Sequence, residues 1–120
     1  MSNTKIIKDF IDAFNRMDWD AIDDLMADDI VYHNIPMQPI EGSAAASAFL
    51  RGMDAVGIDW ELLSIAENGN KVLTERIDNF DLASGKKLSI PVMGTFEIAN
   101  GKIQAWRDYF DLGTFTSQMA

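Results

Sequence analysis

The chain has 120 residues and a formal net charge of −9, with 48% hydrophobic and 24% charged residues. Its mass of 13.4 kDa is that of one domain, large enough to bury a hydrophobic core without disulfides. The composition argues against disorder, and the negative charge argues against binding to nucleic acid or to an anionic membrane surface. Cysteine is absent, which excludes disulfides and thiolate metal sites. We expect a cytoplasmic protein with a single domain over residues 1–120.

Two helices are predicted at the start of the chain. Asn3 or Thr4 could cap the first, in which hydrophobic residues recur at helical spacing: Ile6, Ile7, Phe10, Ile11, Phe14 and Met17. A second, shorter helix is predicted over residues 18–27, with Asp18 as its N-cap. The first segment is amphipathic and carries acidic side chains, which is not the pattern of an apolar signal peptide.

A strand and a third helix are predicted next. Residues 30–35 are rich in β-branched and aromatic side chains, which favours a strand. Two prolines within residues 36–39 end that strand, because proline cannot take part in regular strand pairing. Gly42 and Ser43 open an alanine-rich segment that predicts a third helix ending near Met53.

The second half of the chain predicts antiparallel strands joined by tight turns. The predicted strands are residues 58–67, 71–80, 87–99 and 102–111. Turn residues separate them at Asn68-Gly69-Asn70, Ser84-Gly85-Lys86 and Asn100-Gly101, and the last is the strongest hairpin signal. Helices followed by a meander of strands indicate an α+β fold, in which three helices cover one face of a curved sheet. A pocket is expected in the hollow between helices and sheet.

Few residue types remain for chemistry. His33 is the only histidine, which excludes a zinc site of several histidines. The sequence contains no nucleophile elbow and no glycine-rich nucleotide-binding motif, so we expect no metal and no cofactor. No apolar run approaches about 18 residues, so no transmembrane helix is expected. The candidate catalytic groups are therefore carboxylates and the side chains of arginine, tyrosine and asparagine.

The first unusual segment is residues 72–80, within one of the predicted strands. Strand alternation places Arg76 and Asp78 on the same face as Val72 and Phe80, and neither face of the strand is cleanly apolar. If this face points inward, Arg76 and Asp78 form a buried ion pair. Taken alone, the segment favours instead an ordinary salt bridge on a solvated strand.

The second unusual feature is Asp108, which shares a strand face with Trp106 and Phe110. A carboxylate between two large aromatic side chains lies in apolar surroundings, where it must be paired. Arg76 on a neighbouring strand is the natural partner. In the alternative, Asp108 faces solvent while the residues on either side of it cover the core, although tryptophan and phenylalanine are buried more often than arginine.

The third feature is the pair Tyr32 and Asn34, which share one face of an early strand. They offer a phenol and an amide to the same hollow. Alone this signal is weak, because such residues before Pro36 commonly close a turn. His33 lies on the opposite face and is left out of the predicted site.

Together these residues resemble the limonene-1,2-epoxide hydrolase family, over essentially the whole chain. The resemblance rests on Tyr32-x-Asn34 on an early strand, Arg76-x-Asp78 on a middle strand and Trp106-Arg107-Asp108 on a late strand. The family belongs to the SnoaL-like superfamily of nuclear transport factor 2, ketosteroid isomerase and polyketide cyclases. The resemblance therefore implies an α+β fold with a cone-shaped, curved, mixed but mostly antiparallel sheet and three helices on its concave side.

The resemblance also implies a reaction: water is added to a small hydrophobic epoxide in one step, giving a vicinal diol. Asp108 would be the general base that activates the water, and Asp78 the general acid that protonates the epoxide oxygen. Arg76 would bridge the two carboxyl groups, while Tyr32 and Asn34 would position the water. Opening an epoxide needs a nucleophile at carbon and a proton for the departing oxygen, so the two carboxyl groups must rest in opposite protonation states.

The substrate-binding residues are expected to be apolar, so that they exclude bulk water: Phe80, Val92, Met93, Trp106 and Phe110. One departure from the family concerns the start of the chain. The chain begins almost at its first helix, whereas the limonene enzyme has an N-terminal extension that helps to close its pocket. A substrate other than limonene oxide is therefore compatible with the sequence.

Two alternative functions stay open on the sequence. A ketosteroid-isomerase-like or polyketide-cyclase-like enzyme would use an aspartate to move a proton, but it would not need Arg76 between two acids. A non-catalytic small-molecule binding module of the same fold would use the same residues as a structural network.

A homodimer through the outer face of the sheet is also expected, because three helices cannot cover both faces. Without a partner, apolar side chains on the outer face would lie in water: Leu73, Ile77, Ile103 and Ala105. Relatives in the family commonly pair, which points the same way.

Overall fold

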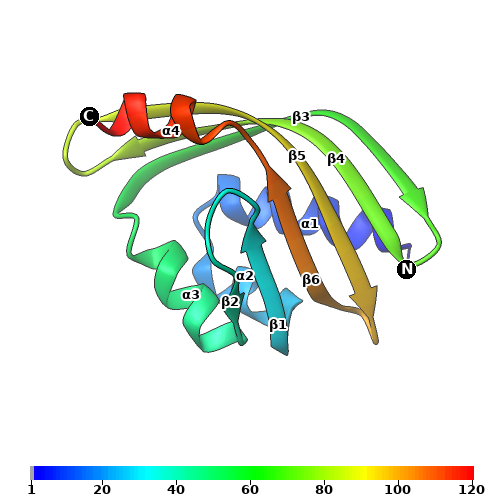
Figure 1. The fold of residues 1–120 in the computed structure, drawn as a ribbon. Helices are drawn as coiled ribbons and strands as arrows, with labels where there is room; N and C mark the ends of the chain where they lie inside the picture. Colours follow the sequence, from blue (N-terminus) through cyan, green and yellow to red (C-terminus); the bar gives the residue numbers. More distant parts are fainter. Residues whose placement is uncertain (1) are drawn as a thin grey trace.

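In a computed structural model, residues 2–120 form one curved sheet and four helices (Figure 1). The elements in chain order are α1 (Asn3–Asn15), α2 (Trp19–Leu25), β1 (Met26–Asn34), β2 (Ile40–Glu41), α3 (Ser43–Arg51), β3 (Ala55–Asn68), β4 (Lys71–Leu82), β5 (Lys87–Ala99), β6 (Lys102–Tyr109) and α4 (Leu112–Met119). Among residues 2–120, none of the helices is long and apolar enough to cross a membrane.

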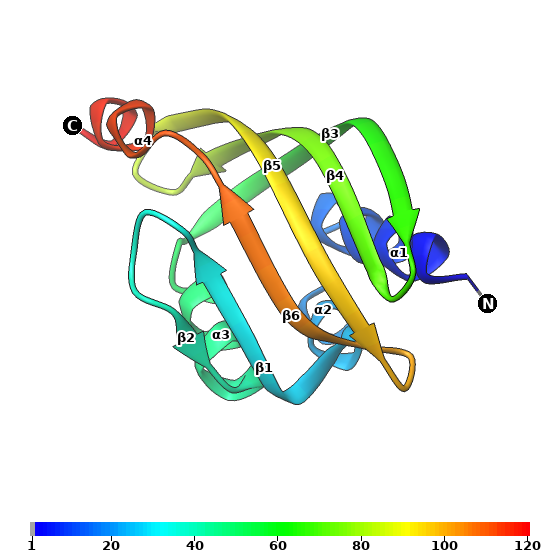
Figure 2. The same cartoon turned by 45° about the vertical axis from the view of Figure 1, so that its right-hand side comes forward.

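The strand order is β2-β1-β6-β5-β4-β3. β1 runs parallel to β6, and the other neighbouring pairs are antiparallel. The curve of the sheet encloses α1, α2 and α3, whereas α4 lies beside β5 at the opposite end from the β5–β6 turn (Figures 1 and 2). The predicted α+β class and mixed, mostly antiparallel sheet are therefore confirmed, with a fourth helix added.

An aromatic cluster fills the hollow between α1 and the sheet. Phe14 of α1 stacks on Trp60 of β3, with ring centres 4.1 Å apart. Phe10 meets Trp106 of β6 edge to face at 5.2 Å, and Tyr32 of β1 stacks on Trp106 at 4.0 Å. These side chains are buried, so they fix the spacing of three strands whose inner faces also carry polar groups.

Most predicted elements are present, and several of their ends differ. Asp18 caps α2 as predicted, and β5 has the predicted bounds. The N-cap of α1 is Ser2, not Asn3 or Thr4, because the Ser2 hydroxyl accepts a hydrogen bond from the backbone N–H of Lys5 at 3.1 Å.

Two elements, β2 and α4, were not predicted. β2 has two residues, which is too short to leave a pattern. α4 contains glycine and threonine, which favour helices weakly, and the predicted strand over residues 102–111 ran into its start. The strand β6 instead ends at Tyr109, and Asp111 caps α4: its carboxylate accepts the backbone N–H of Thr114 at 2.8 Å.

The outer face of the sheet is partly apolar. Leu73 is 40% exposed, while Ile77 and Ala105 are half-buried. The prediction for Ile103 is wrong, because this side chain is fully buried in the core. The β5–β6 register shifts near Ile98, and the bulge breaks the alternation that would have turned Ile103 outward.

Asn15, at the end of α1, ties this helix to the edge strand β3. Its side-chain oxygen accepts the backbone N–H of Trp60 at 2.7 Å, and its side-chain nitrogen donates to the Trp60 carbonyl at 3.2 Å. One amide therefore satisfies both polar backbone groups of a residue at the edge of the sheet.

We predict that Asn15→Ala lowers the free energy of unfolding by about 1–3 kcal/mol, because two partly buried backbone groups lose their partner. Asn3→Ala is the matched control, since Asn3 makes one exposed contact of 3.4 Å with Gly69. Chemical denaturation of both variants measures the difference. Equal stabilities for the two variants would contradict the prediction.

Candidate active site

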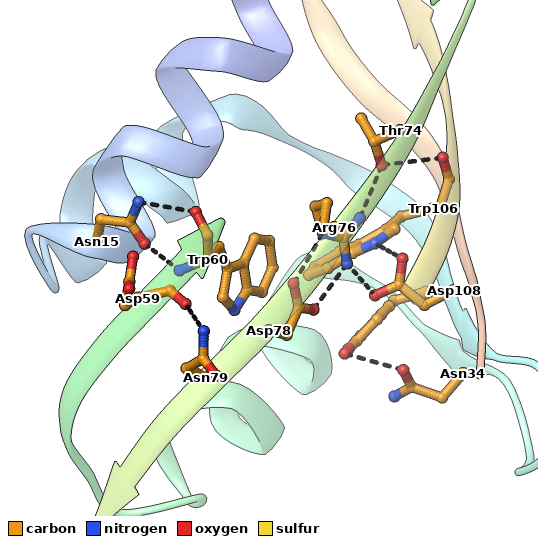
Figure 3. Close-up of polar contacts among 12 residues, drawn as sticks. Asn15, Asn34, Asp59, Trp60, Thr74, Arg76, Asp78, Asn79, Trp106 and Asp108 are labelled. Atoms are coloured by element: carbon orange, nitrogen blue, oxygen red, sulfur yellow. Dashed lines mark hydrogen bonds and ion pairs between the residues drawn. The ribbon is translucent and has the colours of Figure 1, made fainter. Parts of the chain in front are cut away.

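Three charged side chains meet on the inner face of the sheet (Figure 3). Arg76 and Asp78 come from β4 and Asp108 from β6, and their exposed fractions are 0%, 4% and 4%. The inward orientation predicted for Asp108 is therefore correct. The solvated salt bridge that residues 72–80 alone favoured is wrong, because the contact with Asp108 supplies a second carboxylate inside the fold.

Arg76 binds both carboxyl groups. Its Nε and Nη2 donate to the two oxygens of Asp78 at 2.9 and 2.8 Å, a bidentate pair. Nη2 also donates to Asp108 Oδ2 at 3.0 Å. The guanidinium carbon lies 4.6 Å from the ring centre of Trp60, so an aromatic ring covers part of the cation. One buried cation therefore joins two acids from strands that are not neighbours.

Thr74 and Gly94 make this arrangement possible. Nη1 of Arg76 donates to Thr74 Oγ1 at 2.9 Å, and Thr74 Oγ1 donates to the Gly94 carbonyl at 3.2 Å. Gly94 lies on β5, opposite Thr74 on one side and Asp108 on the other. A Cβ there would stand far inside van der Waals contact of Arg76 Nη1 and Asp108 Oδ1. The glycine thus opens the path by which Arg76 reaches across β5.

Asp108 has a second partner in Trp106, whose Nε1 donates to Asp108 Oδ1 at 2.9 Å. Trp106 is fully buried between the rings of Tyr32 and Phe96, so its N–H has a fixed direction. The structure places Trp106 behind the carboxylate, holding it, rather than in the pocket wall where the sequence analysis expected it.

Tyr32 and Asn34 lie beside Asp108 because β1 and β6 are paired. The parallel register sets Asn34 opposite Asp108 and Tyr32 opposite Trp106. The Tyr32 hydroxyl donates to Asn34 Oδ1 at 3.4 Å. His33 points away from this group, and its Nε2 lies 2.9 Å from the Met37 carbonyl.

Burial shapes the ionisation of the site. It raises the pKa of Asp78 to about 6, although the hydrogen bond and positive charge of Arg76 oppose the shift. Burial would lower the pKa of Arg76, but the Asp108 and Asp78 carboxylates outweigh it and the pKa of Arg76 is raised. Burial, and then the charge of Asp108, raise the pKa of Tyr32, so its phenol stays neutral.

A pocket of about 610 Å³, counting its open mouth, lies beside the two aspartates. Its polar lining comes from Tyr32, Asn34, Asp78 and Asp108. The rest of its wall is apolar: Met37, Phe49, Leu50, Met53, Trp60, Phe80, Leu88, Ile90, Val92, Phe110 and Phe115. Among residues 2–120, no three His, Asp or Glu side chains are grouped as metal ligands would be.

Of the apolar residues expected to bind substrate, Phe80, Val92 and Phe110 line the pocket. The prediction for Met93 is wrong: consecutive strand residues face opposite ways, and Met93 is 54% exposed on the outer face. The wall residues from α3 and α4 were not predicted, because only the tertiary fold brings them to the pocket. Gly94 was not predicted either, although a glycine inside a predicted strand is a signal that another group approaches the backbone closely.

The fold is that of cone-shaped α+β proteins. A nuclear transport factor 2-like protein of unknown function from Burkholderia pseudomallei superposes with a TM-score of 0.87 at 17% identity, covering 100% of this chain and 99% of that one. A putative polyketide cyclase from Xanthomonas campestris superposes with a TM-score of 0.83 at 25% identity, covering 98% and 96% of the two chains.

A solved structure and a curated protein, both from Mycobacterium tuberculosis, are more similar in sequence. An epoxide hydrolase from Mycobacterium tuberculosis, described as similar to limonene-1,2-epoxide hydrolase, superposes with a TM-score of 0.85 at 32% identity, covering 97% of this chain and 87% of that one. Epoxide hydrolase EphG of M. tuberculosis is 35% identical over 107 residues, which are 88% of this chain and 71% of that protein. The sequence-family model of the limonene-1,2-epoxide hydrolase catalytic domain matches residues 1–120. The chain belongs to the limonene-1,2-epoxide hydrolase family.

We predict that Gly94→Ala lowers the free energy of unfolding by about 1–3 kcal/mol, because the new methyl group has no room beside the locked Arg76 and Asp108. Gly57→Ala is the matched control on another strand, since the three atoms nearest to its new methyl group belong to the exposed Asp81 side chain, which can move. Thermal unfolding compares the two. A Gly94→Ala protein as stable as the control would show that the network tolerates a side chain there.

Proposed function

We propose that this protein is an epoxide hydrolase that adds water to a small hydrophobic epoxide and releases a vicinal diol. The observation that carries the proposal is the buried Arg76, which is bonded to both Asp78 and Asp108, two residues that line an apolar pocket. Membership of the family supports the same reaction.

Asp108 is the general base in this proposal. It accepts a proton from a water molecule that the Tyr32 hydroxyl and the Asn34 amide hold beside it, and the water oxygen forms a bond to one epoxide carbon. Two of the Asp108 contacts, from Arg76 and Trp106, fix the carboxylate before the reaction begins. Fixed positions lower the entropy that is lost in reaching the transition state.

Asp78 is the general acid. It gives its proton to the epoxide oxygen as the carbon–oxygen bond breaks, so the leaving group departs as an alcohol rather than an alkoxide. Its raised pKa, caused mainly by burial, favours the protonated form that this role requires.

The net charge beside Arg76 stays the same during the reaction. One carboxyl group loses a proton while the other gains one, so the guanidinium faces one carboxylate and one carboxylic acid before and after the step. The proton then returns from Asp108 to Asp78 between turnovers. No covalent ester is formed, and no further nucleophile is needed.

The apolar wall supports a hydrocarbon-rich substrate. Phe80, Val92 and Phe110 lie around the polar groups, so a small hydrophobic epoxide gains by burying its carbon atoms there. The same residues exclude bulk water, and the bound water is then the main nucleophile within reach.

A polyketide-cyclase-like proton transfer is the second candidate, favoured by the 25% identity to a putative polyketide cyclase. A reaction of that kind needs one carboxylate base and a stabilised enolate. That reaction does not require a cation, such as Arg76, bonded to two carboxyl groups. A binding module would likewise not need a carboxylic acid with its pKa raised toward neutrality.

Turnover of a panel of small epoxides, with diol measured by gas chromatography, tests the proposed function. We predict that Asp108→Asn abolishes diol formation and that Arg76→Gln lowers it at least ~100-fold, because the base is lost in one and misplaced in the other. Asp81→Asn is the control, an exposed acid on the same strand as Asp78. Diol formation by folded Asp108→Asn at the wild-type rate would contradict the assignment.

The dependence of kcat/KM on pH tests the acid. Because Asp78 must be protonated and its pKa is raised to about 6, activity is predicted to fall as the pH rises above 6. The expected decline is about tenfold for each pH unit on the alkaline side. A rate that stays constant from pH 6 to 9 would exclude Asp78 as the proton donor.

We further propose that two copies pair through the outer face of the sheet, where Leu73 and Met93 are 40% and 54% exposed. A second copy would cover this apolar area. Light scattering is predicted to report twice the 13.4 kDa of one chain, and Leu73→Glu is predicted to give the single-chain mass. A wild-type mass of one chain at micromolar concentration would contradict pairing.

A further inference from the structure

The edge of β5 is incomplete where α4 lies. β6 pairs with β5 only from Met93 onward, so residues 87–92 have no strand on that side in the part of the chain that the structure describes. Residues two apart direct their backbone polar groups to the same side of a strand. Ser89 and Pro91 therefore present their backbone to the open edge that Met93 shares with β6.

Gln118 of α4 takes the place of the missing strand. Its side-chain oxygen accepts the backbone N–H of Ser89 at 2.7 Å, and its side-chain nitrogen donates to the Ser89 carbonyl at 3.0 Å. At Pro91, the next position facing the edge, there is no N–H to satisfy. The Gln118 amide thus pairs with both polar backbone groups of Ser89 at the open edge and ties α4 to β5.

Few other contacts hold α4. Within residues 112–119 no side chain is fully buried. Phe115 and Met119 pack against an apolar cluster formed by Leu82, Leu88, Ile90 and Val92. Lys86 Nζ donates to the Met119 carbonyl at 2.6 Å, and this contact is exposed, as are the two hydrogen bonds of Gln118. An eight-residue helix with this composition is marginal by itself, so its position depends on its contacts with the sheet, and Gln118 makes two of the hydrogen bonds among them.

Phe115 makes the position of α4 matter for the pocket. Its ring forms part of the pocket wall and meets Phe110, another wall residue, with ring centres 6.3 Å apart. Phe115 and Gln118 are three residues apart on one helix. Any displacement of α4 from β5 therefore moves Phe115 away from the space beside the reacting groups.

We propose that Gln118 is a positioning residue that holds Phe115 against the pocket, and that the two residues set the largest substrate the pocket admits. The inference rests on the proposed epoxide hydrolysis only for the identity of the substrate. The wall contributed by α4 limits the end of the pocket that Phe110 also lines, so a bulky substituent enters only when Gln118 releases Ser89.

The test compares kcat/KM for cyclohexene oxide and for the larger trans-stilbene oxide. Gln118→Ala is expected to shift the ratio toward the larger epoxide by about tenfold or more, the size of effect that small changes in an apolar pocket produce. Phe115→Ala is expected to do the same. Gln118→Glu replaces the donor to the Ser89 carbonyl with a carboxylate oxygen that repels it, so it is also expected to shift the ratio toward the larger epoxide.

Two controls separate positioning from a general loss of stability. Ser117→Ala alters an exposed neighbour on the same helix and should keep the wild-type ratio. The double variant Gln118→Ala/Phe115→Ala should shift the ratio no further than Phe115→Ala alone, because both act through one ring. Additive shifts, or a wild-type ratio in Gln118→Ala, would overturn the proposal.

A second measurement does not depend on catalysis. Cyclohexanol and 4-tert-butylcyclohexanol are titrated into the protein and binding is followed by NMR, with amide exchange measured at Ser89. Gln118→Ala is expected to favour the larger alcohol by about tenfold and to expose the Ser89 amide, whereas Phe115→Ala should leave that amide protected. An unchanged affinity ratio and a protected amide in Gln118→Ala would overturn the proposal. If no epoxide is hydrolysed but these shifts occur, the proposed reaction fails and the positioning role stands.

Discussion

The buried guanidinium of Arg76 is the interaction on which the rest of the site depends. An unpaired charge inside a protein is strongly destabilising, and the two carboxyl groups of Asp78 and Asp108 would repel each other without a cation. Arg76 answers both demands with hydrogen bonds of 2.8 to 3.0 Å. In the proposed mechanism this cation faces one carboxylate and one carboxylic acid, which is the condition that acid–base catalysis by a carboxyl pair requires.

Backbone topology explains why these groups can meet. β5 separates β4 from β6, and only a residue without a side chain at position 94 lets Arg76 cross it. On the other side, the parallel pairing of β1 with β6 sets Asn34 beside Asp108. Arg76 and Asp78, Asp108, and the pair Tyr32 and Asn34 thus come from three strands, β4, β6 and β1. The aromatic core between α1 and the sheet keeps their spacing fixed.

Local periodicity was sufficient to predict the five longer strands and the residues that share a face with Arg76 and Asp108. It could not decide which face of β4 points inward, because the second partner of Arg76 lies 32 residues away in the sequence. Ile103 was placed on the outer face because a bulge leaves no mark in the alternation of side chains. Phe115 was missed for a different reason: α4 gains its place from tertiary contacts with β5, which no short pattern encodes.

The central claim is that Asp108 activates water and does not itself attack the epoxide. A single turnover with excess enzyme in heavy-oxygen water tests it most directly. Direct attack by water puts the label in the diol during the first turnover and leaves the protein unlabelled, and this is the predicted result. An unlabelled first-turnover diol, together with label in the Asp108 carboxylate, would mean an ester intermediate and would contradict the account.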